Sequence, residues 1–355
     1  MRVLATVALC CLLLTCSRGG PANACTSFVM DTPDGPLFGT NCDLFIPGDG
    51  LVLVNRRGVV KETYQTNTNG ERAKWTSEYG SVTFSLAGRE FVWGGMNEAG
   101  LVLSSMQLTT TEYPEPDERP ALLDGTWGQY ILDTCDSIEE VIRTDSVVTV
   151  RDQGPGSHYL VSDADGNCVA VEYLDGQLVY YAGDDLPVKA MSNMRYGRAL
   201  AAYERGGTRW WWSNPGQSAE RFAACQARAE SFDAGRDTSA VNYAFGTLVY
   251  HVAAPHTRWN IVFNVAEREL WFRSDQSPTY KHISMDSFDF SCDAPKLMLD
   301  VNAQLEGDVE SHFAPYDRVV NREIFSTFCA RWGIKVSEEG TDELMRHFET
   351  FECTQ

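Results

Sequence analysis

The stretch ANACTSF, residues 22–28, governs how the rest of the chain is interpreted, because it joins a signal-like segment to a cysteine. Met1–Ala24 begins with a positive charge at Arg2, continues with a largely apolar run from Val3 to Leu14, and ends in the small-residue pattern A-x-A. This order is typical of a secretory signal peptide that is cut after the last alanine. We therefore predict that residues 1–24 are removed, and that Cys25 becomes the first residue of a periplasmic or extracellular protein.

A cysteine in first position carries a thiol and a free α-amine on the same residue. The amine has an unperturbed pKa of about 8, so near neutral pH part of it is uncharged and can accept the thiol proton. Cys25 would then be a nucleophile that carries its own base. Two other roles stay open from this stretch alone: half of a disulfide, or the lipidated first residue of a lipoprotein. A lipoprotein signal typically has leucine three residues before the cysteine, where this chain has Ala22.

The charge of the chain limits its partners. The full sequence has 29 basic and 49 acidic residues. Loss of the signal removes Arg2 and Arg18, which leaves 27 basic against 49 acidic residues and a net charge of −22. Such a surface disfavours nucleic acid and anionic membranes. The apolar run of the signal is too short to span a bilayer and no later run approaches that length, so we expect a soluble mature protein without a membrane partner.

The cysteines indicate disulfides more than metal. Of the 11 cysteines, three lie in the signal and eight remain, and export permits disulfides among them. If Cys25 is free, an odd number of cysteines is left, so at least one more thiol is unpaired. No pair shows C-x-x-C spacing, and no histidine lies near a cysteine at zinc-finger spacing. We therefore predict no metal site.

Alternating apolar residues and turn residues predict antiparallel strands. Thr26–Met30 and Leu37–Thr40 flank Asp34-Gly35, which predicts a hairpin that begins directly after Cys25. Leu51–Asn55 and Val59–Thr63 form a second expected pair around Arg57-Gly58. Further strands are expected at Ser81–Leu86, Glu90–Trp93, Leu101–Met106, Tyr159–Ser162, Val169–Tyr173, Gln177–Tyr181, Trp259–Val265 and Glu269–Phe272.

Helices are expected between these groups of strands. One covers Trp127–Arg143, where the capping-box spacing of Ser137 and Glu140 indicates a break, and another covers Ala219–Ser231 with Ser218 as its N-cap. Strand groups that alternate with helices, without a βαβ period, favour an α+β domain with antiparallel sheets.

The chain changes character after Cys292. Charged helical stretches follow at Asp317–Trp332 and Thr341–Phe351, and no strand pattern is visible among them. We interpret residues 293–355 as a C-terminal helical extension of a catalytic domain that covers residues 25–292.

Six groups of residues occur in an informative order. They are CTSF at 25–28 with FGTNCD at 38–43, GMNEAGL at 95–101, the segment His158–Tyr173, Ser192-Asn193, SAERF at 218–222, and TRW at 257–259. Together they resemble the choloylglycine hydrolase and penicillin V acylase family of N-terminal nucleophile hydrolases, over about residues 25–292. The resemblance implies a four-layer αββα sandwich of two antiparallel sheets, with the nucleophile at the start of a central strand.

The resemblance also assigns roles to single residues. Cys25 would attack the amide carbonyl and form a thioester, and Asp43 would orient the α-amine. Asn193 would donate a side-chain N–H to the oxyanion, and the second donor would be the backbone N–H at Gln107. Arg221 would lie near the thiol and lower its pKa.

Thr40 departs from the family pattern. Many members carry an arginine three residues before the aspartate, beside the nucleophile, and this chain has Thr40 there. Arg56 or Arg57 on the next predicted hairpin could supply the missing charge. The departure also leaves open a different class of function, a catalytically silent secreted binding protein on the same fold.

Three adjacent tryptophans, Trp210, Trp211 and Trp212, lie between Asn193 and Arg221. They cannot all point into one core, because successive strand residues face opposite ways. A loop of this kind could line a pocket for apolar acyl groups, and ordinary packing at the surface is the alternative. His158 and His256 lack the context of a cysteine protease, so we assign neither a catalytic role.

The sequence therefore predicts an exported, cofactor-free hydrolase that cleaves a linear amide between an acyl group and a small amine. Its partner would be a small acyl amide, with an apolar acyl group and a neutral amine unless a local arginine binds an anionic one. Bile-salt conjugates, phenoxyacetyl penicillins, acyl-homoserine lactones and N-acylethanolamine lipids all stay open as substrates. The oligomeric state stays open as well, a homo-oligomer included.

Overall fold

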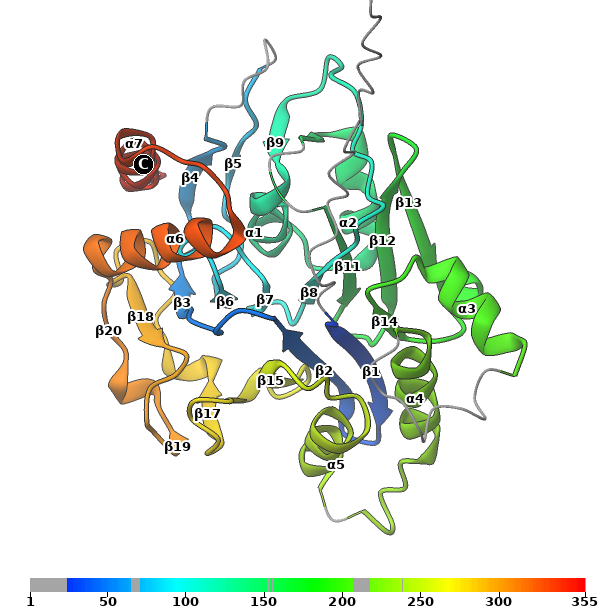
Figure 1. The fold of residues 1–355 in the computed structure, drawn as a ribbon. Helices are drawn as coiled ribbons and strands as arrows, with labels where there is room; N and C mark the ends of the chain where they lie inside the picture. Colours follow the sequence, from blue (N-terminus) through cyan, green and yellow to red (C-terminus); the bar gives the residue numbers. More distant parts are fainter. Residues whose placement is uncertain are drawn as a thin grey trace, which may run out of the picture.

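A computed structural model describes residues 24–64, 71–151, 154, 156–206, 218–237 and 239–354. Two large sheets are stacked face to face, and helices cover both outer faces (Figure 1). The four layers confirm the predicted αββα sandwich. Within the described residues, no helix has both the length and the apolar character that a membrane span requires.

The first sheet carries the N-terminal hairpin at its centre. Its seven strands are antiparallel except for the last pair, which is parallel. In spatial order they are β14 (Ala190–Ser192), β1 (Thr26–Thr32), β2 (Gly35–Asp43), β15 (Thr257–Asn264), β16 (Glu269–Ser274), β17 (Lys281–Ser284) and β19 (Gly307–Asp308).

The second sheet has nine antiparallel strands. In spatial order they are β13 (Gln177–Ala182), β12 (Cys168–Leu174), β11 (Ser157–Ser162), β8 (Val102–Gln107), β7 (Gly94–Asn97), β6 (Ser81–Ser85), β3 (Leu51–Asn55), β18 (Leu297–Asp300) and β20 (Ala314–Pro315). Two small sheets are formed by β9 (Ala121–Leu123) with β10 (Thr149–Arg151), and by β21 (Glu352–Cys353), β4 (Val59–Glu62) and β5 (Lys74–Thr76).

Helices pack on both sides of the sandwich. The outer face of the second sheet packs on α1 (Asp124–Thr134) and α2 (Ile138–Arg143), which together with β8, β11 and β12 enclose a core of their own. The first sheet packs on α4 (Ser218–Ser231) and α5 (Ala240–Gly246), and α3 (Tyr196–Glu204) lies against α4. Two C-terminal helices, α6 (Arg318–Trp332) and α7 (Glu338–Glu349), lie beside β3 and β4 at one side of the molecule (Figure 1). Short single-turn helices cover Thr144–Ser146, Gly183–Asp185, Thr247–His251, Met285–Ser287 and Glu310–His312.

The main core lies between the two sheets. Phe38 and Phe263 of the first sheet meet Phe84 of the second, with ring centroids 6.1 Å apart for Phe38–Phe263 and 6.2 Å apart for Phe84–Phe263. All three rings are fully buried. β2 is buried on both faces, because one face meets the second sheet and the other meets the helices.

The predicted N-terminal hairpin is confirmed. β1 and β2 pair from Thr26 with Asn41 to Thr32 with Gly35. Gly35 has a φ of +112°, and a Cβ at this position would lie 2.7 Å from the Cβ of Ala266, so only glycine fits the turn. The break between α1 and α2 and the meander β11–β12–β13 are also as predicted.

Two predictions about strands are wrong. β3 and β4 do not pair with each other, because both edges of β3 are occupied by β6 and β18, and β4 pairs with β5 and β21 instead. Glu90–Trp93 is a loop, and the strand forms directly after it, at Gly94–Asn97.

The C-terminal segment is only partly as expected. The two helices are present, but the segment also contributes β18 and β20 to the second sheet, β19 to the first, and β21 to a small sheet. Its strands are two to four residues long, too short for alternation to be visible in the sequence. A disulfide between Cys292 and Cys353 closes this segment. The domain boundary at residue 292 itself stays a prediction.

Candidate active site

The hairpin brings Cys25 to Asp43. Cys25 directly precedes β1 and is 2% exposed, and its Sγ lies 3.8 Å from the backbone oxygen of Asp43 at the end of β2. The hairpin register fixes this proximity. Because Thr26 pairs with Asn41, Cys25 lies opposite Cys42, the residue next to Asp43. The sequence prediction that these two residues form one site agrees with this geometry.

The carboxyl group of Asp43 is fully buried. Its Oδ1 accepts a hydrogen bond from the hydroxyl of Thr257, and its Oδ2 makes no hydrogen bond with any described residue. Burial raises the pKa of Asp43 to about 7, although the Thr257 hydrogen bond and the charges of Arg221 and Arg258 act in the opposite direction. Asp43 therefore changes its charge near neutral pH, beside the candidate nucleophile.

Arg221 reaches the site from α4. Its side chain is 1% exposed, and Nε donates a hydrogen bond to the Thr26 hydroxyl at 2.7 Å. Burial lowers the pKa of the guanidinium, while the nearby Asp43 and Cys25 raise it. A guanidinium stays charged over this range, so Arg221 supplies positive charge close to the thiol.

Asn193 follows β14 and lies at the edge of the site. Its Nδ2 donates to the backbone oxygen of Gln107 at 2.8 Å, and its Oδ1 accepts from Arg221 at 3.4 Å. Gln107 ends β8 and lines the same cavity as Cys25. One N–H of the Asn193 amide is thus occupied by Gln107, which leaves the second N–H for an oxyanion. The oxyanion roles of Asn193 and Gln107 stay predictions.

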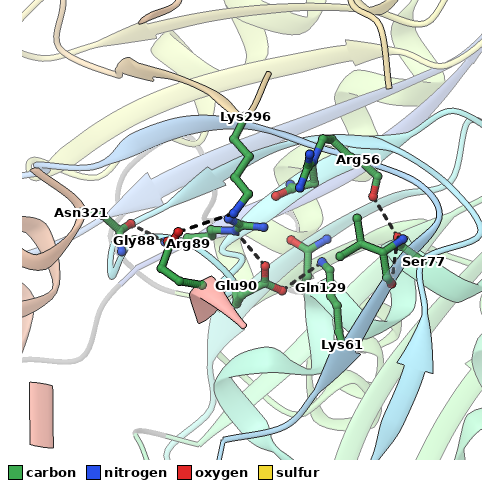
Figure 2. Close-up of polar contacts among 12 residues, drawn as sticks. Arg56, Lys61, Ser77, Gly88, Arg89, Glu90, Gln129, Lys296 and Asn321 are labelled. Carbon is green, nitrogen blue, oxygen red and sulfur yellow. Dashed lines mark hydrogen bonds and ion pairs between the residues drawn. The ribbon is translucent and has the colours of Figure 1, made fainter. Parts of the chain in front are cut away.

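Thr40 belongs to a chain of hydroxyl groups between the sheets. Its Oγ1 lies 2.8 Å from the Ser27 hydroxyl and 2.9 Å from that of Ser104. Neither proposed substitute for the family arginine reaches this place. Arg56 binds the backbone oxygens of Cys292 and Ala294 and lies beside Ser77 (Figure 2), and Arg57 pairs with Glu98 at the surface. Our suggestion that Arg56 or Arg57 replaces the charge is therefore wrong, because both are bound elsewhere.

Sequence reasoning missed the position of Cys42. The hairpin register places it opposite Cys25 on the neighbouring strand. Burial raises the pKa of the Cys42 thiol well above its ordinary value, and the Cys25 thiol beside it adds to this shift. Cys42 therefore stays protonated, whereas Cys25 lines the cavity. Counting residues across the predicted turn could have found this pair.

A buried pair behind the site was also missed. His158 on β11 and Glu172 on β12 are both fully buried, with Nδ1 and Oε1 3.1 Å apart. The same Oε1 accepts the backbone N–H of Tyr196 at 2.9 Å, at the start of α3. The pair thus holds the segment that carries Asn193. His256 instead stacks on Phe45, with ring centroids 3.8 Å apart.

Cys25 opens into a cavity of about 360 Å³. The polar lining residues include Tyr64, Ser105, Gln107, Asp124 and Ser157, and Asp124 is the one charged group among the described residues that line it. The remaining walls are mainly apolar and include Leu44 and Trp93. Trp210, Trp211 and Trp212, our predicted pocket residues, lie outside the described residues. No cluster of metal-binding side chains occurs in the described part of the chain.

The model of one family, linear amide C–N hydrolases of the choloylglycine hydrolase family, matches residues 25–205, just over half of the chain. The chain belongs to this family. It is therefore an amide C–N hydrolase, as the sequence motifs predicted, and its family range begins at Cys25.

Individual members show how far the similarity extends. The chain is 24% identical over 366 aligned positions to a penicillin V acylase of Pectobacterium atrosepticum, covering 88% of this chain and 96% of the relative. The solved penicillin V acylase from Agrobacterium tumefaciens is 25% identical, and its structure matches with a TM-score of 0.71. The match covers 82% of this chain and 98% of the solved chain. A conjugated bile acid hydrolase from Clostridium perfringens, solved as a mutant, shares the fold at 14% identity and a TM-score of 0.62. The match covers 80% of this chain and 98% of the solved chain.

Proposed function

We propose that this family member is exported, is cut after Ala24, and uses the new N-terminal Cys25 to hydrolyse an acyl amide through a thioester. One observation carries the proposal. Cys25 lies at the base of an apolar cavity, and beside it Asp43 has a buried Oδ2 without a partner among the described residues and a pKa of about 7. A free α-amine on Cys25 is the group that such a carboxyl would bind and orient.

The reaction then runs in two halves. The sulfur of Cys25 attacks the carbonyl carbon, and the thiol proton passes to the α-amine of the same residue. Asn193 and the backbone N–H of Gln107 stabilise the oxyanion, and Arg221 supplies nearby positive charge. The C–N bond breaks, the amine leaves with the proton from the α-ammonium, and the acyl group stays on sulfur as a thioester. Water attacks the thioester, which releases the acid and restores the thiol.

The cavity supports an apolar acyl group and an uncharged leaving amine. Its described lining contains Asp124 but neither lysine nor arginine, and Arg221 is held by Thr26, Ser218 and Asn193. Among the described lining residues an anionic amine would therefore meet the carboxyl group of Asp124 and no basic side chain. Among the relatives, the name penicillin V acylase supports a substrate in which an acyl group is bound to an amide nitrogen.

The N-terminus provides the test. Mass analysis of the exported protein should show Cys25 as the first residue with a free amine, and a thiol-reactive acyl probe should label that residue. A matched form with Ala24 still attached should fold but hydrolyse no acyl amide, since its amine is in a peptide bond. Equal activity in both forms, or a blocked Cys25, would refute the mechanism. Absence of hydrolysis in the mature form with a free Cys25 would favour the silent binding protein.

A further inference from the structure

The far end of the cavity is built by the C-terminal helices. Cys25 lines the cavity directly before β1, and another part of the wall comes from α6, α7 and the turn between them, which lie away from the start of β1 (Figure 1). The lining residues from this part are Phe325, Phe328, Cys329, Trp332, Ile334, Val336, Gly340 and Leu344. They are apolar, whereas Ser105, Gln107, Asp124 and Ser157 lie on β8, β11 and at the start of α1. The cavity thus has a reactive end and an apolar end.

A loop connects the two ends. Residues 86–93 lie between β6 and β7, and five of them line the cavity: Leu86, Ala87, Phe91, Val92 and Trp93. The ring of Phe91 stacks on Phe325 of α6 with centroids 5.6 Å apart. The backbone N–H of Arg89 donates to Oδ1 of Asn321, also on α6, at 2.7 Å (Figure 2). Helix α6 is therefore fixed to the loop that leads from the thiol.

Buried charges hold this loop in one conformation. Glu90 has a φ of +71°, which is rare for a residue with a side chain, and is 2% exposed. Its carboxylate pairs with Lys61 at 3.0 Å and with Arg89 at 3.1 Å, and Lys61 also binds Asp133 at 2.9 Å (Figure 2). Such a conformation persists only where the surroundings fix it. The distal wall is thus preformed.

We propose that α6 and α7 form the distal wall of the acyl site, and that Phe328 and Leu344 set the length of a linear aliphatic acyl chain. This inference rests on the proposed function, because the acyl carbonyl must lie at Cys25. The described residues of the distal end offer no charged group, so an unbranched hydrocarbon tail fits it better than an acyl group with a polar end. Both helices lie outside residues 25–205, the range that matches the family model. The residues that would select the length of the acyl chain therefore lie outside this range.

The experiment compares acyl length profiles. The mature enzyme is given amides of one neutral amine with acetyl, butanoyl, octanoyl, dodecanoyl and palmitoyl groups, and kcat/KM is measured for each. A bulky Leu344→Phe variant should lose at least about tenfold on the longest chain it accepts in the wild type, because single methylene groups in such pockets are worth about tenfold or more. Phe328→Ala should move the optimum to longer chains. In both variants the readout is the ratio of kcat/KM on each longer chain to kcat/KM on the acetyl amide.

The matched control is Ile324→Ala, which lies on α6 but packs against the separate cluster of Leu51 and Met298. It should keep the wild-type profile. The milder Phe328→Leu keeps the test valid if Phe328→Ala fails to fold, as thermal unfolding will show. An unchanged profile in folded Leu344→Phe and Phe328→Leu, with acetyl activity intact, would overturn the distal wall and leave the proposed function standing. Failure of the wild type to hydrolyse any amide would instead overturn the proposed function and this inference with it.

Discussion

At the scale of single residues, Cys25 is one of two facing thiols, and only it lines the cavity. Cys25→Ala should abolish hydrolysis, and Cys25→Ser should lose most of it, because a hydroxyl's much higher pKa makes the α-amine too weak a base for it. Turnover of a chromogenic acyl amide measures both, with thermal unfolding as the check on folding. Near wild-type turnover in Cys25→Ala would point to another nucleophile, and Cys42→Ala is the matched control that should stay active.

Asp43 gives a prediction about pH. Its pKa is about 7 in the folded chain with Ala24 attached, against 3.8 for an ordinary aspartate. Between these pH values the folded state holds a proton that the unfolded state has released, so rising pH favours unfolding across this window, and the effect levels off above it. We predict that the free energy of unfolding of this form falls from about pH 4 to 7.

Urea unfolding at a series of pH values measures the effect. Asp43→Asn should remove the fall, because the amide does not titrate. Parallel curves for the two proteins would show that Asp43 is not held protonated. The mature form offers a comparison, since its α-ammonium would favour the charged carboxylate and should reduce the fall.

At the scale of elements, β11 and β12 position α3 through a buried pair. Glu172 accepts from Tyr196 and pairs with His158, so it fixes the segment that carries Asn193. Glu172→Gln exchanges a charged acceptor for a neutral one, and we expect kcat to fall by about tenfold. This is less than the loss of about 10² or more expected for Asn193→Ala, which removes an oxyanion donor.

Steady-state kinetics and thermal unfolding together test the positioning role of Glu172. A purely structural role would lower the melting temperature and leave kcat of the folded fraction unchanged. A positioning role lowers kcat with little change in KM. Thr134→Val, at the C-terminal end of α1, serves as a control that loses a partly buried hydrogen bond and should not change kcat.

Elements defined by local turns could be predicted from the sequence, and those defined by distant partners could not. The β1–β2 hairpin and the β11–β13 meander follow from short turns, so their pairing follows from the chain order. β3 instead pairs with β18 from the far end of the chain, and nothing near Leu51–Asn55 indicates this partner. The loop at Glu90 was mistaken for a strand because buried ion pairs, and not local preference, decide its conformation.

The same distinction applies to the site. Cys25, Asp43, Asn193 and Arg221 are brought together, and the resemblance to family motifs was what singled them out. The distal helices could not be found in this way, because their contacts with the cavity depend on packing between remote segments. The pocket role predicted for the tryptophans at 210–212 rested on their composition alone.

At the scale of the whole molecule, the disulfide Cys292–Cys353 closes the segment that carries α6 and α7. Cys353→Ser should lower the free energy of unfolding by about 2–4 kcal/mol, because the unfolded chain gains freedom. If α6 and α7 form the acyl wall, activity on long acyl chains should also fall more than activity on acetyl amides. Denaturant unfolding and the acyl panel measure the two effects, with Cys168→Ser, at a free cysteine that does not line the cavity, as a control for loss of a thiol. Unchanged stability in Cys353→Ser would show that the bridge does not constrain the chain.

The cavity joins Cys25, at the start of the described chain, to Leu344, near its end. During synthesis the nucleophile leaves the ribosome well before α6 and α7, which form the other part of the wall. A prematurely terminated chain that stops before α6 would carry the reactive thiol and lack the surface that receives a long substrate. The binding site is thus complete only once α7 has been made, and fragments that stop before α6 are expected to be poor catalysts for long acyl chains.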